Sequence, residues 1–191
     1  MIFTASVLAI IGARASDIEQ LYLKARYAVV LDSIPGLAAR PPVRRVQTAY
    51  QVADFAVNER GATELYLDSH IQLSPEWSDA YHESLVDLPI QFFGKVPRRV
   101  LILGGGDGGV AGQLLRYGAA VESITLVELD PMMVRLARQD PWFVSFNRRA
   151  FDDPRVRVDY ADAIEWLRNA DVGRFDAVYV DFPLPYDFDL L

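Results

Sequence analysis

The chain has 191 residues, no cysteine, two histidines and a formal net charge of -7, from 26 acidic and 19 basic residues. This length suits one sizeable α/β domain with a small appended element. The acidic balance excludes a broad electrostatic footprint for nucleic acid, and the residue counts exclude disulfides, thiolate zinc sites and histidine-rich metal sites.

Residues 1–42 are predicted to form an apolar segment, a helix and a linker. The apolar run 1–12 is shorter than the roughly 20 residues that cross a bilayer as a helix. It is either a buried terminal helix or the end of a longer membrane segment, and we favour the second. A capping box at Ser16 and an apolar stripe predict a helix over 17–31, and the residues 33–42 are rich in Pro, Gly and Ala, as linkers are.

Residues 43–75 are predicted to form a small β-hairpin domain. Apolar and polar residues alternate from Arg44 to Val57, a turn follows at 58–61, and further strands are expected at 63–67 and 71–73. We expect this antiparallel β unit to precede the main domain.

Residues 76–191 are predicted to form a Rossmann-like nucleoside-binding domain. A helix is expected at 76–88. After it, strands are expected at 100–103, 124–128, 156–160 and 177–180, and helices at 110–117, 131–138 and 163–169. Strands that alternate with helices indicate an α/β fold with a doubly wound parallel sheet. Such sheets usually have more than four strands, so we expect this domain to be incomplete at its C-terminus.

Acidic residues follow the predicted strands, at the edge where doubly wound sheets bind ligands. Gly104, Gly106 and Gly109 satisfy G-x-G-x-x-G, and Glu128 lies about 20 residues downstream, where a ribose-binding acid belongs. However, Asp107 would place a negative charge among the amides that should hold a pyrophosphate. The loop therefore favours a cationic ligand without phosphate, such as an adenosyl sulfonium compound.

Two further strand ends carry groups that suit a nucleoside. Glu128 can accept hydrogen bonds from both ribose hydroxyls, and Asp162 can accept one from the adenine amine, with the Ala163 amide completing the contact. The plainer alternatives are a surface acid in a turn for Glu128 and a helix N-cap for Asp162.

The chain resembles the spermidine synthases, the polyamine aminopropyltransferases, from about Tyr50 to Asp181. The specific part of this resemblance is a GGGDGG loop preceded by YHE. The matching motifs are Tyr50-Gln51, Leu67-Asp68, Tyr81-His82-Glu83, Gly104 to Gly109, Val127-Glu128-Leu129-Asp130, Asp153-Pro154-Arg155-Val156, Asp162-Ala163 and Asp181.

This resemblance implies a methyltransferase-like Rossmann domain after a small β-stranded domain, usually in a homodimer. It also implies transfer of the aminopropyl group of decarboxylated S-adenosylmethionine, the co-substrate, to a polyamine, with release of 5'-methylthioadenosine and with no metal or further cofactor. The implied roles are nucleoside contacts from Gln51, Gly104, Gly106, Asp107, Glu128, Asp162 and Ala163, amine contacts from Tyr81, His82, Asp107 and Asp181, and proton removal by Asp181.

One position departs from the family pattern. Leu184 stands where soluble members carry a second acid in a D-x-x-D-P run, which argues against putrescine as the acceptor, although Asp187 or Asp189 could substitute. Some bacterial relatives carry a membrane-spanning N-terminal half. We therefore expect a cytoplasmic domain, on the cytoplasmic face of the membrane if the full-length protein has such an anchor.

Two alternative functions remain open at this point. An S-adenosylmethionine-dependent methyltransferase shares the sheet and the ribose acid, but Asp107 would repel the carboxylate of that donor. A noncatalytic nucleoside-binding or polyamine-binding domain would keep the pocket, but it has no need of a base at Asp181.

Overall fold

The structure, a computed structural model, describes residues 43–58 and 60–183. They belong to two compact units, one of residues 43–47 and 51–75 and the other of residues 48–50 and 76–183. The predictions for residues 1–42 and for Leu184, Asp187 and Asp189 lie outside the described residues.

The first unit is an antiparallel sheet with the strand order β1-β2-β3-β4. The alternating run that was predicted from Arg44 to Val57 contains two strands, because the chain turns back and Gln47 pairs with Val52. Asp54 is fully buried, and the Nε and a terminal nitrogen of Arg45 donate to its two oxygens at 2.7 Å each, which compensates the buried charge. The strands are β1 (Arg44–Gln47), β2 (Val52–Val57), β3 (Thr63–Leu67) and β4 (His70–Leu73).

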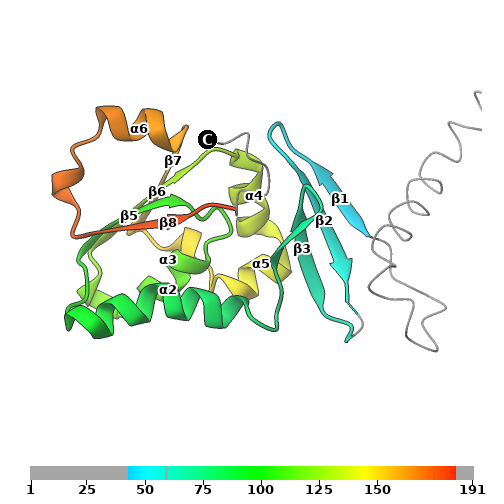
Figure 1. The fold of residues 1–191 in the computed structure, drawn as a ribbon, viewed down its shortest axis with the longest axis horizontal. Helices are drawn as coiled ribbons and strands as arrows, with labels where there is room; N and C mark the ends of the chain where they lie inside the picture. Colours follow the sequence, from blue (N-terminus) through cyan, green and yellow to red (C-terminus); the bar gives the residue numbers. More distant parts are fainter. Residues whose placement is uncertain (1–42, 59, 184–191) are drawn as a thin grey trace, which may run out of the picture. The chain divides into compact units, whose positions relative to one another are not determined.

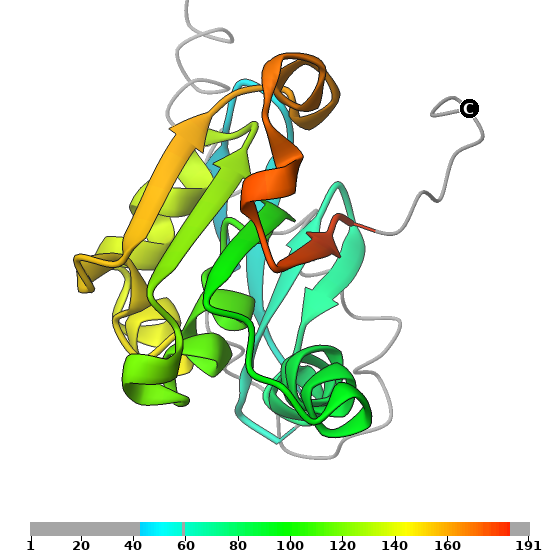
Figure 2. The ribbon, with the colours of Figure 1, turned by 90° about the vertical axis from the view of Figure 1, so that its left-hand side faces the viewer.

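The second unit contains a parallel sheet with the strand order β7-β6-β5-β8, seen in Figures 1 and 2. All three pairings are parallel, which confirms the predicted doubly wound α/β fold. The central strands β5 and β6 supply most of the core, because Val, Leu and Ile follow one another there and are buried on both faces. The strands are β5 (Arg99–Gly104), β6 (Ser123–Glu128), β7 (Val156–Tyr160) and β8 (Ala177–Asp181).

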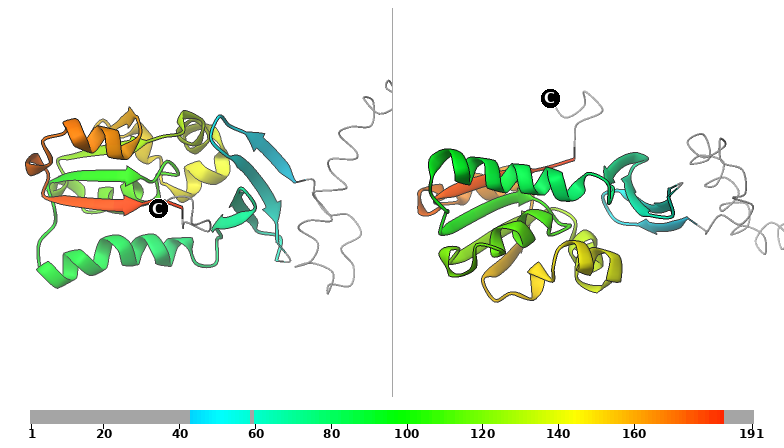
Figure 3. Two further views of the ribbon diagram at one scale, coloured as in Figure 1. Left: turned by 45° about the horizontal axis from the view of Figure 1, so that its top comes forward. Right: turned by 90° about the horizontal axis from the view of Figure 1, so that it is seen from below.

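Helices lie on both sides of this sheet. Figure 3 shows α2 on one side and α6 on the other, where α6 packs on the apolar cluster of Leu101, Leu103 and Val127. Both α4 and α5 begin with a proline after an aspartate that accepts a hydrogen bond as N-cap, a sequence typical of helix starts. The helices are α2 (Ser78–Phe93), α3 (Gly109–Leu115), α4 (Pro131–Gln139), α5 (Pro141–Phe146) and α6 (Ala163–Asn169).

Helix α2 positions part of the candidate site. Its buried residues Ser78, His82, Val86 and Ile90 recur every four positions and so form one face. The helix was predicted to end at Leu88, but it continues through a proline to Phe93, because Ile90 extends the buried face by one more turn. None of the helices in the described ranges is both long enough and apolar enough to cross a membrane.

Candidate functional site

Asp181 is the last residue of β8, opposite Gly104 of β5. Its backbone carbonyl accepts a hydrogen bond from the amide of Gly105 (3.0 Å), which ties the glycine loop to the strand end. Its side-chain Oδ1 accepts a hydrogen bond from the hydroxyl of Tyr81 (3.0 Å), while Oδ2 is buried without a hydrogen-bond partner. A side chain at Gly104 would collide with the Asp181 carbonyl, so this close approach requires glycine.

His82 lies in the first part of α2, on its buried face. Its Nδ1 lies 2.7 Å from the carbonyl oxygen of Ser78, and because a carbonyl only accepts, Nδ1 must carry a proton. Its Nε2 is buried without a hydrogen-bond partner and lies 3.9 Å from Oδ2 of both Asp107 and Asp181. Nε2 therefore faces two carboxylates without a hydrogen-bond partner of its own.

Asp107 comes from the glycine loop between β5 and α3. Its Oδ1 accepts a hydrogen bond from the amide of Gly109 (2.6 Å), and this leaves Oδ2 to face His82. A Cβ atom at Gly109 would lie 2.5 Å from the His82 Nε2, so the missing side chain makes room for the imidazole. The loop itself is held by Asn147, whose side-chain nitrogen donates to the carbonyls of Asp107 and Ala137 at 2.9 Å each.

Glu128 ends β6 beside the same loop. Its Oε2 accepts a hydrogen bond from the amide of Gly106 (3.0 Å) and its Oε1 accepts one from the amide of Asp130 (2.8 Å). Each carboxylate oxygen has two lone pairs, so both can still accept a hydroxyl hydrogen. Burial raises the pKa of Glu128, and the backbone hydrogen bonds oppose this rise.

Asp162 and Ala163 lie at the start of α6, beyond the end of β7. Asp162 is exposed and its Oδ1 caps the helix by accepting from the amides of Ile164 (2.8 Å) and Glu165 (2.9 Å). The capping role named as the alternative is therefore present. It is compatible with ligand binding, because Oδ2 remains to accept from an amine.

The electrostatics of the site are set by acids close to one another. Burial raises the pKa of Asp181 from its ordinary 3.8 to about 6, and the negative charge of Asp107 adds to this, while His82 and the Tyr81 hydroxyl oppose it. Burial and then the charge of Asp181 likewise raise the pKa of Tyr81 above its usual range. The Tyr81 phenol thus stays protonated and remains a donor to Asp181.

The structure brings four of the residues predicted for amine binding together: Tyr81, His82, Asp107 and Asp181. Gln51 lies in the other unit, just before β2, and its predicted nucleoside contact stays a prediction. Sequence reasoning missed Ser78 and Asn147. The backbone carbonyl of Ser78 binds His82, and the side-chain amide of Asn147 holds the glycine loop. Their residue types are common in loops and helices, and only burial marks them as part of the site.

A parallel doubly wound sheet with acids converging beside a glycine loop defines a Rossmann-like protein of the methyltransferase type. Residues 78–187 match the spermine/spermidine synthase domain, and the chain belongs to this family. The resemblance found in the sequence motifs is thereby confirmed.

Three comparisons illustrate this relationship. The chain is 45% identical over 126 residues to polyamine aminopropyltransferase 2 of Ralstonia nicotianae, a match that covers 66% of this chain and 24% of that relative. It is 37% identical over 187 residues to polyamine aminopropyltransferase 1 of Streptomyces coelicolor, covering 95% of this chain and 32% of the relative. A crystal structure of spermidine synthase in complex with the transition state analogue AdoDATO superposes with a TM-score of 0.67 and 30% identity, over 75% of this chain and 47% of that one.

The chain thus spans from about a quarter to about half of the length of these relatives. The comparisons give no support to the methyltransferase alternative.

Proposed function

We propose that this site transfers the aminopropyl group of decarboxylated S-adenosylmethionine to an amine acceptor. The observation that carries the proposal is the convergence of Asp107 and Asp181 on Nε2 of His82, each with its Oδ2 at 3.9 Å. Among residues 43–58 and 60–183, neither carboxylate has a Lys or Arg partner, so the site is complementary to a cationic ligand. Both the sulfonium donor and an ammonium acceptor meet that requirement.

The donor's nucleoside fits the groups beside the loop. Glu128 can accept from the ribose hydroxyls while Gly106 holds its Oε2 in place, and Asp162 can accept from the exocyclic amine of adenine. This arrangement leaves the aminopropyl chain to extend toward Asp107 and Asp181. The donor lacks the carboxylate of S-adenosylmethionine, which the neighbouring carboxylates of Asp107 and Asp181 would repel.

The reaction is a nucleophilic displacement at carbon. An alkylamine has a pKa near 10, so it arrives protonated and must lose a proton before its nitrogen can attack. We assign this proton to Oδ2 of Asp181. The amine lone pair then forms a bond to the aminopropyl carbon next to sulfur. The carbon–sulfur bond breaks and its electrons go to the sulfonium, which leaves as neutral 5'-methylthioadenosine.

The environment of Asp181 suits this role. A carboxyl with a pKa of about 6 is ionised at neutral pH and is a stronger base than one at the ordinary value of 3.8. The Tyr81 hydroxyl fixes the carboxylate through Oδ1 and leaves Oδ2 directed at the site. The acceptor amine, a homodimer, a cytoplasmic location and a membrane anchor in the full-length protein stay predictions from the family resemblance.

Product analysis tests the proposal. The full-length protein, offered decarboxylated S-adenosylmethionine and a panel of amines, should yield an amine extended by one aminopropyl group together with 5'-methylthioadenosine, both detected by mass spectrometry. Methylated products from S-adenosylmethionine would contradict it.

Calorimetry provides an independent check of the donor. We expect decarboxylated S-adenosylmethionine to bind at least about tenfold more tightly than S-adenosylmethionine, since tenfold corresponds to only about 1.4 kcal/mol of charge repulsion. Equal affinities would remove Asp107 as the residue that selects the donor.

A further inference from the structure

Two buried polar atoms of the site lack hydrogen-bond partners among the described residues that could satisfy them: Nε2 of His82 and Oδ2 of Asp181. Oδ2 of Asp107 points to the same place, and one potential ligand atom from each of the three residues lies within 4.8 Å of the others. A buried polar atom without a partner is unfavourable, so such atoms mark a place where a ligand can bind. Three potential ligand atoms that converge on one point suit a metal ion, whose binding displaces any proton that a ligand carries.

Each of the three groups is also held by its other polar atom. The Nδ1 of His82 donates to the carbonyl of Ser78, Oδ1 of Asp107 accepts from the amide of Gly109, and Oδ1 of Asp181 accepts from the hydroxyl of Tyr81. Metal ligands in proteins are oriented in this way, with the second ring nitrogen of a histidine donating to a carbonyl or carboxylate. The free atoms are therefore directed before any ligand arrives.

We propose that His82, Asp107 and Asp181 bind a divalent transition-metal ion of the zinc class, which blocks the site rather than taking part in transfer. One imidazole nitrogen and two carboxylate oxygens suit Zn²⁺, whereas Mg²⁺ and Ca²⁺ prefer oxygen alone.

The geometry of the three residues fits such an ion. Zinc bonds of about 2.0–2.2 Å place tetrahedral ligand atoms roughly 3.4 Å apart. The two distances of 3.9 Å from His82 Nε2 thus need to shorten by about 0.5 Å, and the two carboxylate oxygens, which lie within 4.8 Å of each other, must approach by rotation of the partly exposed Asp107 side chain. The ion can enter past Asp107, whose side chain is 17% exposed against 3% for His82.

Binding of the ion would exclude the acceptor amine. One divalent cation neutralises the two carboxylates, and it occupies the place that the proposed function gives to the ammonium group. This consequence rests on the proposed function, but metal binding itself does not.

The experiment uses the fact that the chain contains only two histidines, His70 and His82. The protein with labelled histidine is titrated with Zn²⁺ at pH 7, and the imidazole resonances are followed by NMR. We expect the His82 signals to shift up to one equivalent of Zn²⁺, with His70 unchanged, and no shift with Mg²⁺. An unchanged His82 signal in tenfold excess of Zn²⁺ would overturn the proposal.

Variants locate the ligands. His82→Gln and Asp107→Asn should each weaken Zn²⁺ binding, measured by calorimetry, by at least about tenfold. His70→Gln and Asp176→Asn are matched controls and should leave it unchanged. If His82→Gln loses the fold, judged by circular dichroism, Asp107→Asn decides, because its side chain is partly exposed. Equal weakening by the controls would also overturn the proposal.

A kinetic arm separates this proposal from the proposed function. In the full-length enzyme, Zn²⁺ should raise the KM for the amine without changing kcat. If NMR shows Zn²⁺ at His82 and this competition is absent, the metal site stands and the position assigned to the amine is wrong.

Discussion

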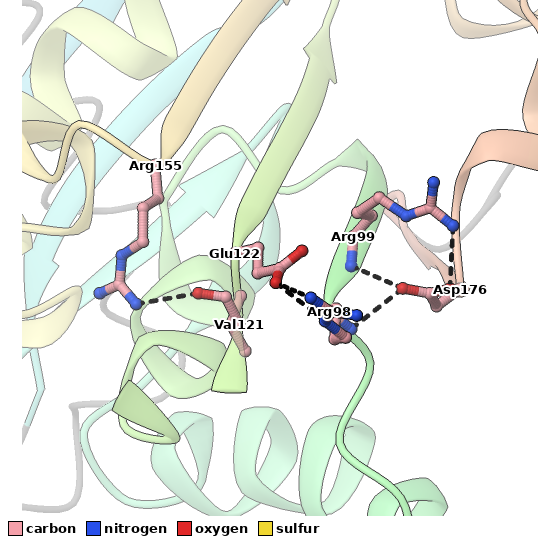
Figure 4. Close-up of polar contacts among 6 residues, drawn as sticks. All are labelled: Arg98, Arg99, Val121, Glu122, Arg155 and Asp176. Carbon is pink, nitrogen blue, oxygen red and sulfur yellow. Dashed lines mark hydrogen bonds and ion pairs between the residues drawn. The ribbon is translucent and has the colours of Figure 1, made fainter. Parts of the chain in front are cut away.

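The two ends of the parallel sheet differ in whether their charged side chains have partners. At the amino ends of the strands, charged residues lie beside an oppositely charged or carbonyl partner, as Figure 4 shows for Arg98 with Glu122, Arg99 with Asp176, and Arg155 with the carbonyl of Val121. At the carboxyl ends, Asp107, Glu128 and Asp181 gather without a Lys or Arg partner among the described residues, and the one basic residue there that Asp107 and Asp181 face is His82.

The pKa values follow this division within a single strand. Asp176 lies just before β8, and the backbone amide and side chain of Arg99 lower its pKa. Asp181 ends the same strand, and burial raises its pKa to about 6. The ion pairs at the amino end therefore stabilise the fold. At the carboxyl end, nearby carboxylates repel one another, and a bound cationic ligand would reduce this repulsion.

The largest expected effect comes from making the same substitution, Asp to Asn, at the two ends of β8 and comparing the two variants. Asp181→Asn should lower kcat by a factor of about 10³, because the general base is lost. Nucleoside binding should persist, since Glu128 and the loop remain. Asp176→Asn is the control, and its kcat should stay within about twofold. Steady-state kinetics of the full-length protein check both, and a similar kcat for both variants would remove Asp181 as the base.

Adding a methyl group at Gly106, at the carboxyl end of the sheet, should have the next largest effect. A Cβ atom at Gly106 would lie 2.6 Å from Oε2 of Glu128, so Gly106→Ala should displace this carboxylate from the ribose. We expect donor affinity to fall by about 10-fold to 100-fold, as for the loss of one or two hydrogen bonds to a charged group. In Gly173→Ala a Cβ would meet only the Asp171 side chain, at 3.3 Å, and calorimetry should find donor affinity unchanged.

The pH dependence of kcat/KM should report the acid at the carboxyl end. Asp181 must be ionised to take a proton, so the rate should rise about tenfold per pH unit below its pKa of about 6 and then level off. Asp107→Asn should move this limb to lower pH, because the charge of Asp107 raises the pKa of Asp181. A limb near pH 4 in the unmodified protein would contradict the burial of Asp181.

The smallest effect concerns stability. The folded state protonates Asp181 more readily than the unfolded chain does, so this residue destabilises the fold fully above pH 6 and not at all below about pH 4. Asp181→Asn should therefore raise the free energy of unfolding by about 3 kcal/mol at pH 7 and leave it unchanged at about pH 3. Asp176→Asn should lower it at pH 7, because that pKa is depressed. Urea denaturation at the two pH values measures both signs.

The sequence predicted the sheet and the acids at its edge because both depend on local patterns. Val100 to Leu103 form a short apolar run between turn residues, and in a parallel sheet the residue after such a run must lie at the ligand edge. For this reason the sequence could predict that Asp107, Glu128 and Asp181 lie at the same edge of the sheet.

Other features depend on contacts between residues distant in sequence. The extension of α2 through Pro89 is decided by the burial of Ile90, which outweighs the hydrogen bond that proline cannot make. Any residue can supply the backbone carbonyl that binds His82, so the sequence does not reveal this contact. The hydrogen bond from Asn147 to the loop likewise cannot be predicted from residue type. The break between β1 and β2 was missed because the alternation of residues continues across the turn.

Asp181 holds the glycine loop through its backbone, whereas the proposed reaction uses only its side chain. The hydrogen bond from the amide of Gly105 to the Asp181 carbonyl forms whichever side chain the residue carries. A single codon change at this position would consequently remove the base while the scaffold of the loop persists. The same separation lets an engineer exchange this side chain without redesigning the backbone.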